Sequence, residues 1–258
     1  MADTLIVLPT FDEIENIDSM VGRIRQSVPS ADLLIVDDAS PDGTGRRADD
    51  LAATDAGISV LHREAKGGLG AAYLAGFDRA IEGGYEFVVE IDADGSHNPA
   101  TLPAMIAAAR KGADLVIGSR WVPGGRVENW PWLRQVISRG GNTYSRLVLG
   151  SSIRDLTSGF RVLRTAALRH AHLSTVSSQG YCFQVEMAWR LERGGARVVE
   201  HPITFIERVH GVSKMRTAIV VEALARVTWW GLTRALRRVD PIRGSSTAAP
   251  ATKNVPGA

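Results

Sequence analysis

Short, wholly apolar segments alternate with longer amphipathic segments over the first 120 residues of the chain. The apolar segments predict strands at 5–8, 33–36, 58–61, 87–91 and 115–118. The amphipathic segments predict helices at 13–26, with Asp12 as its N-cap, and at 42–53, 69–82 and 99–111. Apolar strands that alternate with helices are typical of a mostly parallel sheet covered by helices on both faces. The expected fold class is therefore α/β.

The second half of the chain has a less regular pattern. It predicts a Gly-, Pro- and Trp-rich loop at 121–132, a helix at 133–149, a turn entering a strand at 155–161, a helix at 184–193 and a strand at 198–205. A long helix is expected at 217–239, and the Ser-, Thr-, Ala- and Pro-rich composition from residue 241 onward is typical of disorder. These patterns divide the chain into a main domain at 1–216, an amphipathic helix at 217–240 and a disordered tail at 241–258.

Polar residues follow four of the predicted strands, at 9–13, 37–43, 92–94 and 118–120. Ligands of open α/β sheets bind beyond the carboxyl ends of the strands. We therefore expect these four segments to meet at one crevice that carries several acids and one arginine.

Asp92 and Asp94 are the most informative residues of that crevice, because they are two positions apart directly after an apolar strand. Gly95 and the pair Asn98-Pro99 favour a turn there, so that both carboxylates can reach one point. A hard divalent cation prefers such oxygen ligands, and a diphosphate prefers that cation. An ordinary solvated turn is the alternative interpretation.

Composition narrows the class of protein without identifying it. The chain has 258 residues, of which 45% are hydrophobic and 22% charged, so it can bury a large core. Its formal net charge of +2 gives no sign of nucleic-acid binding. Cys182 is the single cysteine, which fits a reducing compartment. We expect neither a signal peptide nor a membrane-spanning helix, since no apolar stretch is long enough.

Several segments, taken as an ordered set, resemble known glycosyltransferases. The segments 9–13, 36–43 and 92–97 resemble family-2 glycosyltransferases of the GT-A fold. The segments 118–120, 138–142, 155–161, 180–187 and 208–215 resemble dolichol-phosphate (polyprenol-phosphate) mannose synthases. The resemblance covers about residues 4 to 216 and implies a metal-dependent, inverting transfer of mannose from GDP-mannose to polyprenyl monophosphate.

The resemblance also implies roles for individual residues. The positions that match guanosine-binding residues are Pro9, Phe11, Glu13, Val36 and Asp38. Asp92 and Asp94 match the ligands of Mg²⁺ or Mn²⁺, with the Ala93 backbone contacting the donor. Arg120, Arg208 and Lys214 match residues that contact phosphate or donor, and together with the two aspartates they form the expected catalytic set. Phe11 replaces the more common tyrosine, and Ser96 replaces a glutamine that serves some members as a further metal ligand.

The chemistry of the reaction supports these roles independently of the resemblance. Cleavage of a sugar–diphosphate bond develops negative charge on the leaving diphosphate, which a cation at Asp92 and Asp94 would neutralise. Arg208 and Lys214 could add positive charge near the same oxygens or near an incoming phosphate. An acceptor phosphate is already anionic at neutral pH and needs little help from a general base. His97 is therefore interpreted as a local structural hydrogen-bonder.

Other polar segments have structural interpretations beside functional ones. Asp37 and Asp38 could form a plain turn, and Gly67, Gly68 and Gly70 more readily allow a helix to start close to the sheet than form a dinucleotide loop. The segment 155–161 could be structural, with Arg161 paired to Asp155 or another acid. Gln184 and Glu186 could be buried hydrogen-bonders.

The predicted terminal helix has an apolar face and a basic face. The apolar face contains Val221, Leu224, Trp229, Leu232, Ala235 and Leu236, and the basic face contains Arg226, Arg234, Arg237 and Arg238. Such a helix, with Trp229-Trp230, can lie in a membrane interface, although packing on its own domain with a solvated basic face is an alternative. A polyprenyl acceptor favours a peripheral position on the cytoplasmic face of a membrane, reached directly or through a membrane-anchoring protein partner.

Two alternative functions use the same residues. One is transfer of another sugar to polyprenyl phosphate, such as glucose from UDP-glucose, because a few pocket contacts decide base and sugar selectivity. The other is a non-catalytic protein that binds nucleotide sugars or phospholipids. The presence of Asp92, Asp94, Arg120, Arg208 and Lys214 together favours the enzyme.

Overall fold

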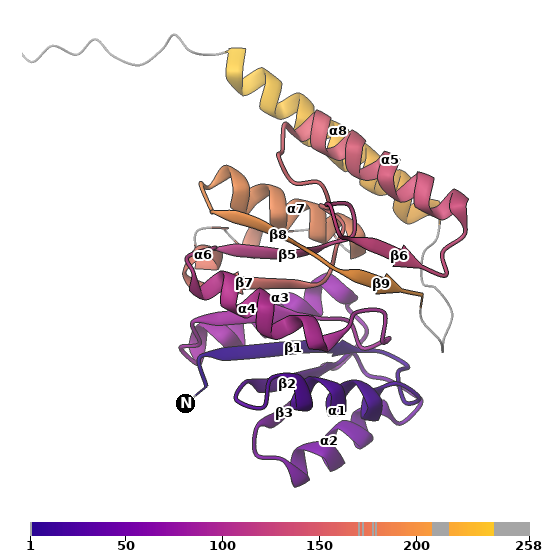
Figure 1. Ribbon diagram of the computed structural model, residues 1–258, viewed down its shortest axis with the longest axis vertical. Helices are drawn as coiled ribbons and strands as arrows, with labels where there is room; N and C mark the ends of the chain where they lie inside the picture. Colours follow the sequence, from indigo (N-terminus) through magenta and orange to yellow (C-terminus); the bar gives the residue numbers. More distant parts are fainter. Residues whose placement is uncertain are drawn as a thin grey trace, which may run out of the picture.

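A seven-stranded sheet lies at the centre of the structure, a computed structural model that describes residues 2–169, 171, 173–176, 178, 180–207 and 217–239 (Figure 1). In spatial order the strands are β3 (Ile58–His62), β2 (Asp32–Asp37), β1 (Thr4–Thr10), β4 (Phe87–Glu90), β7 (Arg161–Arg164), β5 (Leu115–Ser119) and β8 (Val198–Pro202). Strand β7 is antiparallel to both its neighbours, and the other paired strands are parallel. The expectation of a mostly parallel sheet is confirmed.

Helices cover both faces of this sheet and form two hydrophobic cores. One core contains side chains of α1 (Ile17–Ser27), α2 (Thr44–Thr54) and α4 (Leu102–Arg110), the last preceded by the short η1 (Pro99–Thr101). The other contains side chains of α3 (Leu69–Glu82), α6 (Thr165–Arg169) and α7 (Gly180–Arg193), with η2 (Leu173–Thr175) between the last two. Successive side chains of a strand point to opposite faces. Leu5 and Val7 therefore join the second core, and Ile6 and Leu8 the first.

Two helices pack side by side at the β8 end of the sheet (Figure 1), and they are α5 (Trp132–Leu149) and α8 (Thr217–Val239). A Cβ on Gly231 would lie 2.3 Å from Val148 Cγ1, so glycine allows the close approach of α8 to α5. Trp230 stacks on Trp189 of α7 with ring centroids 5.8 Å apart. Of the tryptophan pair in α8, Trp230 therefore packs on the protein itself, whereas Trp229 is largely exposed. Among the described residues, no helix combines the length and apolarity needed to span a bilayer.

The structure corrects three further expectations about local elements. Helix α1 begins at Ile17 and is capped by Asn16, because Asp12 has a φ of 55° and the residues after it form a turn. That turn is held by the first residue of α2 (Thr44–Thr54): Glu13 N donates to Thr44 Oγ1 at 3.0 Å. A short strand, β6 (Arg126–Glu128), occupies part of the expected loop at 121–132. It pairs with β9 (Thr204–Ile206), which is separate from β8 in the segment where one strand was expected.

Candidate active site

Asp92 and Asp94 follow β4 and are each held in place by a hydroxyl group. Tyr73 of α3 is completely buried, and its phenol donates a hydrogen bond to Asp92 Oδ1 at 3.0 Å. Ser96 donates from its backbone nitrogen and from Oγ to Asp94 Oδ1, at 3.0 and 2.6 Å. Ser96 therefore orients the aspartate beside it in this structure. These contacts fix the two carboxylates at the mouth of one pocket.

The pocket brings acids and cations from distant parts of the chain together. Its lining residues are Asp92, Asp94, Ser96, His97, Arg120, Trp130, Arg134, Thr157, Ser158, Gly159, Phe205 and Glu207. Asp92, Asp94 and Arg120 were expected at one site, and the structure places them there. Two carboxylates facing two guanidinium groups can hold a cation and an anionic group next to each other.

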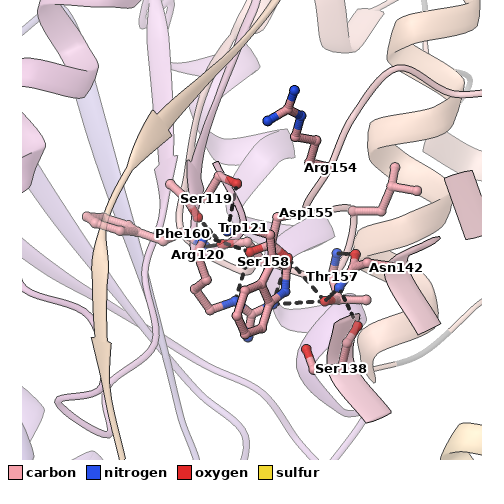
Figure 2. A network of polar contacts seen from close by, with 12 residues as sticks. Ser119, Arg120, Trp121, Ser138, Asn142, Arg154, Asp155, Thr157, Ser158 and Phe160 are labelled. Carbon is pink, nitrogen blue, oxygen red and sulfur yellow. Dashed lines mark hydrogen bonds and ion pairs between the residues drawn. The ribbon is translucent and has the colours of Figure 1, made fainter. Parts of the chain in front are cut away.

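Arg120 lies directly after β5 and belongs to a buried polar network (Figure 2). Its Nε donates to Asp155 Oδ2 at 2.8 Å, and its Nη2 donates to Asp155 Oδ1 at 2.7 Å and to Thr157 Oγ1 at 2.9 Å. Burial acts to raise the pKa of Asp155, but the charge of Arg120 and its hydrogen bonds hold that pKa below the ordinary value. The partner of Asp155 is thus Arg120, so of the two alternatives for Arg161, Asp155 or another acid, the first is wrong.

Arg134 of α5 is a pocket residue that the sequence analysis did not identify. Its guanidinium lies 4.1 Å from the ring centroid of Trp130, and its Nη1 donates to Glu207 Oε1 at 2.5 Å. The sequence signal for it is an arginine at the start of the predicted helix, shortly after Trp130 and Trp132. Sequence spacing could not predict the approach of Glu207, because that residue is 73 positions away.

His97 is buried between Phe160 and Phe205, with ring centroids 5.0 and 5.1 Å away. Its Nε2 lies 3.7 Å from Asp92 Oδ2, and in the described part of the chain its Nδ1 has no hydrogen-bond partner. The expectation of a local structural hydrogen-bonder is therefore wrong. The ring packs against aromatic side chains and lines the pocket beside Asp92 instead.

A second buried ion pair lies at the end of β4, two positions before Asp92 in the chain. Arg161 Nε is 3.9 Å from Glu90 Oε2, and both side chains are completely buried. Burial raises the pKa of Glu90 to about 7, although the charge of Arg161 acts in the opposite direction. Arg161 Nη2 donates to the Leu156 carbonyl at 2.8 Å. Glu90 is thus the other acid with which Arg161 pairs.

The residues expected to bind guanosine lie at the ends of β1 and β2 and just beyond them. Asp38 accepts hydrogen bonds from Arg63 Nη1 at 2.5 Å and from the backbone nitrogens of Gly67 and Gly68 at 3.1 and 2.8 Å. It therefore holds the loop that starts α3, which agrees with the structural interpretation of those glycines. Lys66 Nζ lies 3.5 Å from the centroid of the Phe11 ring.

Other candidates in this region have structural contacts. Pro9 is half-buried, whereas Val36 is completely buried in the core. Glu13 accepts a hydrogen bond from Asn16 Nδ2 at 2.7 Å. Asp37 accepts one from Thr10 Oγ1 at 3.0 Å, and it accepts another from Ser40 N at 3.1 Å, as expected for a turn residue.

The donor set around Asp92 and Asp94 fits a hard divalent cation, because carboxylate oxygens are the ligands that Mg²⁺ and Mn²⁺ prefer. Within the described ranges, no group of three or more His, Cys, Asp or Glu side chains is arranged to hold a metal. A cation here would therefore take its remaining ligands from water or from substrate oxygens. Ala93 is buried between the two aspartates. Arg208 and Lys214 lie outside the described residues.

Comparison with known proteins decides the family. The family model described as glycosyl transferase family 2 matches residues 5–171. The chain belongs to this family. It is 51% identical over 242 residues to polyprenol monophosphomannose synthase of Mycolicibacterium smegmatis, covering 93% of this chain and 90% of that protein. It is 53% identical over 228 residues to undecaprenyl-phosphate mannosyltransferase of Micrococcus luteus, covering 88% and 93%. The prediction of a glycosyltransferase is confirmed.

Solved structures confirm the GT-A fold. Glucosyl-3-phosphoglycerate synthase of Mycobacterium tuberculosis, in complex with Mn²⁺, UDP and glucosyl-3-phosphoglycerate, matches with a TM-score of 0.62 and 20% identity. The match covers 90% of this chain and 78% of that chain. A mannosyltransferase of Pyrobaculum calidifontis, in complex with GDP-mannose and Mn²⁺, matches with a TM-score of 0.58 and 16% identity, covering 91% and 64%.

Proposed function

We propose that this glycosyltransferase transfers mannose from GDP-mannose to a polyprenyl monophosphate, with inversion at the anomeric carbon. The observation that carries the proposal is one pocket lined by Asp92, Asp94 and two arginines, in a chain more than half identical to two polyprenyl-phosphate mannosyltransferases. Both relatives cover about nine-tenths of this chain.

In the proposed reaction, an oxygen of the acceptor phosphate forms a bond to the anomeric carbon of mannose. The bond from that carbon to the diphosphate oxygen breaks, and GDP leaves with the electron pair. The attacking oxygen is already anionic at neutral pH, so no side chain has to remove a proton. This suits a pocket whose histidine is packed between phenylalanines, and it leaves electrostatic stabilisation and positioning as the main tasks of the protein.

Asp92 and Asp94 would hold Mg²⁺ or Mn²⁺, which neutralises charge that develops on the departing diphosphate. The mannosyltransferase and the glucosyl-3-phosphoglycerate synthase matched above both carry Mn²⁺ in their crystals, which supports a divalent ion without choosing between metals. Arg120 and Arg134 would contact the acceptor phosphate from the opposite wall of the pocket, since both line it with the aspartates. In the absence of acceptor, Asp155 and Glu207 balance these two charges.

The donor nucleoside would bind at Pro9, Phe11, Glu13 and Asp38, whereas the expected residue Val36 is completely buried and would offer no side-chain contact. In this proposal Phe11 stacks on the base, while Asp38 contributes by holding the loop at Gly67 and Gly68. Arg208 and Lys214 would add positive charge next to the diphosphate, and replacing either by alanine should cost about 1–3 kcal/mol of transition-state stabilisation. Wild-type kcat/KM in both variants would remove them from the site.

We further propose that α5 and α8 contact the surface of the membrane that carries the acceptor. Both helices expose large apolar side chains, which are Trp132, Leu133, Val136, Ile137 and Leu147 on α5 and Leu224, Trp229 and Leu232 on α8. Exposed tryptophan and leucine on neighbouring helices are typical of helices that lie in a membrane interface. Arg134 joins this surface to the pocket, because it is on α5 and lines the active site.

Radiolabelled donors test the proposed function directly. Purified enzyme with Mg²⁺ is mixed with vesicles that contain polyprenyl monophosphate and with labelled GDP-mannose, UDP-glucose or UDP-GlcNAc. We expect labelled lipid from GDP-mannose alone. Labelled lipid from UDP-glucose alone would replace mannose by glucose, and the absence of labelled lipid from every donor would contradict transfer to polyprenyl phosphate.

A further inference from the structure

Asn142 is a buried amide on the inner side of α5 that uses both ends of its side chain on one loop (Figure 2). Its Nδ2 donates to Thr157 Oγ1 at 3.0 Å and to the Ser138 carbonyl, also at 3.0 Å. Its Oδ1 accepts from Thr157 N at 3.3 Å. A backbone N–H can only donate, so Oδ1 has to face it and the orientation of the amide is fixed.

Thr157 lies between Asn142 and Arg120, and its hydroxyl is fully used. The oxygen accepts from Asn142 Nδ2 and from Arg120 Nη2, and the hydroxyl hydrogen points to Asp155 Oδ1 at 3.3 Å. A hydroxyl has one hydrogen and two lone pairs, so these three contacts leave it a single orientation. Without Asn142, one lone pair would lose its donor and the hydroxyl could turn away from Arg120.

Arg120 is held by the Thr157 hydroxyl as well as by its ion pair with Asp155. Asp155 takes Nε and one hydrogen of Nη2, and Thr157 takes the second hydrogen of Nη2. The plane of the guanidinium is thus set by two acceptors on the same loop. A phosphate contact of Arg120 in the pocket would use Nη1, whose direction follows from that plane.

We propose that Asn142 is a positioning residue for the transfer reaction, which acts through Thr157 to hold the Arg120 guanidinium toward the phosphate pocket. This inference rests on the proposed function in one respect, namely that Arg120 contacts a phosphate there. It assigns Asn142 no contact with substrate. Helix α5 thus contacts the active site through two side chains, Asn142 and Arg134.

A double-mutant cycle between Asn142 and Arg120 tests the proposal. The variants are Asn142→Ala, Arg120→Lys and the double variant; Arg120→Lys keeps a positive charge next to Asp155 but loses the Nη2 donor that meets Thr157. We expect Asn142→Ala to lower kcat/KM about tenfold in the wild-type background and less than about threefold in the Arg120→Lys background. A purely structural role would lower kcat/KM by the same factor in both. A loss in the Arg120→Lys background at least half as large, on a logarithmic scale, overturns the proposal.

Two further measurements complete the test. Ser145→Ala, at another buried position of α5, is the matched control and should leave kcat/KM and the melting temperature within error of wild type. The affinity for inorganic phosphate, which stands in for the acceptor phosphate, is measured by calorimetry; it should fall in Asn142→Ala and should not fall further when Arg120→Lys is added. This readout does not depend on the donor sugar, so failure of GDP-mannose transfer and failure of the Asn142 proposal are distinguishable. Wild-type affinity for inorganic phosphate in Asn142→Ala overturns the proposal.

Discussion

At the scale of single residues, the site is defined by carboxylates whose surroundings differ. Asp92 and Asp94 line a pocket with cations, whereas Asp155 is buried against Arg120 and Asp38 is occupied by a loop. The sequence identified the first pair correctly as residues of one crevice, because strand ends of a parallel sheet meet. It could not assign Arg120 to Asp155, since 35 positions separate them.

Replacing either aspartate that is proposed to bind the metal should remove activity and leave the fold intact. Asp92→Asn and Asp94→Asn each lose a charged ligand, so we expect kcat to fall at least about a hundredfold, with a normal circular dichroism spectrum. EDTA should abolish wild-type transfer, and Mg²⁺ or Mn²⁺ should restore it. The matched control is Asp50→Asn, an exposed acid on α2. Full turnover in EDTA would exclude a metal-dependent mechanism.

Acid should destabilise the protein through Asp155. The folded pKa of this carboxyl is below its ordinary value, so its contribution is present above pH ~4, the unfolded pKa, and is lost as pH falls through the folded pKa. Breaking this buried pair with Asp155→Asn should cost about 3 kcal/mol at pH 7. In denaturant titrations, the difference from wild type should shrink steadily below pH ~4. A difference that stays constant down to pH ~2 would contradict the assignment.

At the scale of elements, helices α5 and α8 show that the local sequence pattern sets where a helix forms, whereas packing decides which of its faces is buried. Their amphipathic patterns predicted both helices with bounds within one residue of those observed. Which face is covered depended on the partner: Trp230 packs on Trp189, and Val227 is buried, while Leu224, Trp229 and Leu232 remain exposed. The loop at 121–132 contains a strand for a similar reason, because β6 forms only by pairing with β9.

The exposed apolar side chains of α5 and α8 should bind membranes. Trp132→Ser on α5 and Trp229→Ser on α8 should each weaken binding to anionic vesicles by about 1 kcal/mol or more, because each removes an aromatic side chain from the interface. The KM for a long polyprenyl phosphate should rise, and the KM for a short soluble analogue should not. Ile206→Ser, an exposed position on β9, is the control. Unchanged vesicle binding in both tryptophan variants would remove these helices from the membrane contact.

At the scale of the whole molecule, binding of nucleotide and metal should be coupled to stability. GDP at about 100 times its Kd, with Mn²⁺, should add about 2.7 kcal/mol and raise Tm by roughly 5–10 °C. In the proposed mechanism Asp92 and Asp94 would hold the metal, and its charge would favour binding of the diphosphate, so GDP alone should give a smaller shift. Asp92→Asn should abolish the difference between GDP with and without Mn²⁺. Equal shifts with and without metal in the wild-type enzyme would contradict a shared metal–diphosphate site.

The sequence by itself determined the α/β class, the five parallel strands of its first half, the helices between them and the family. These follow from local patterns, since hydrophobic periodicity and ordered motifs are present in the chain before it folds. Tertiary structure decided the rest: the antiparallel insertion of β7, the ion pairs of Arg120 and Arg161, the packing of His97 and the presence of Arg134 in the pocket. Each of these is a contact between residues far apart in sequence, and its partner is fixed only when the sheet brings the segments together.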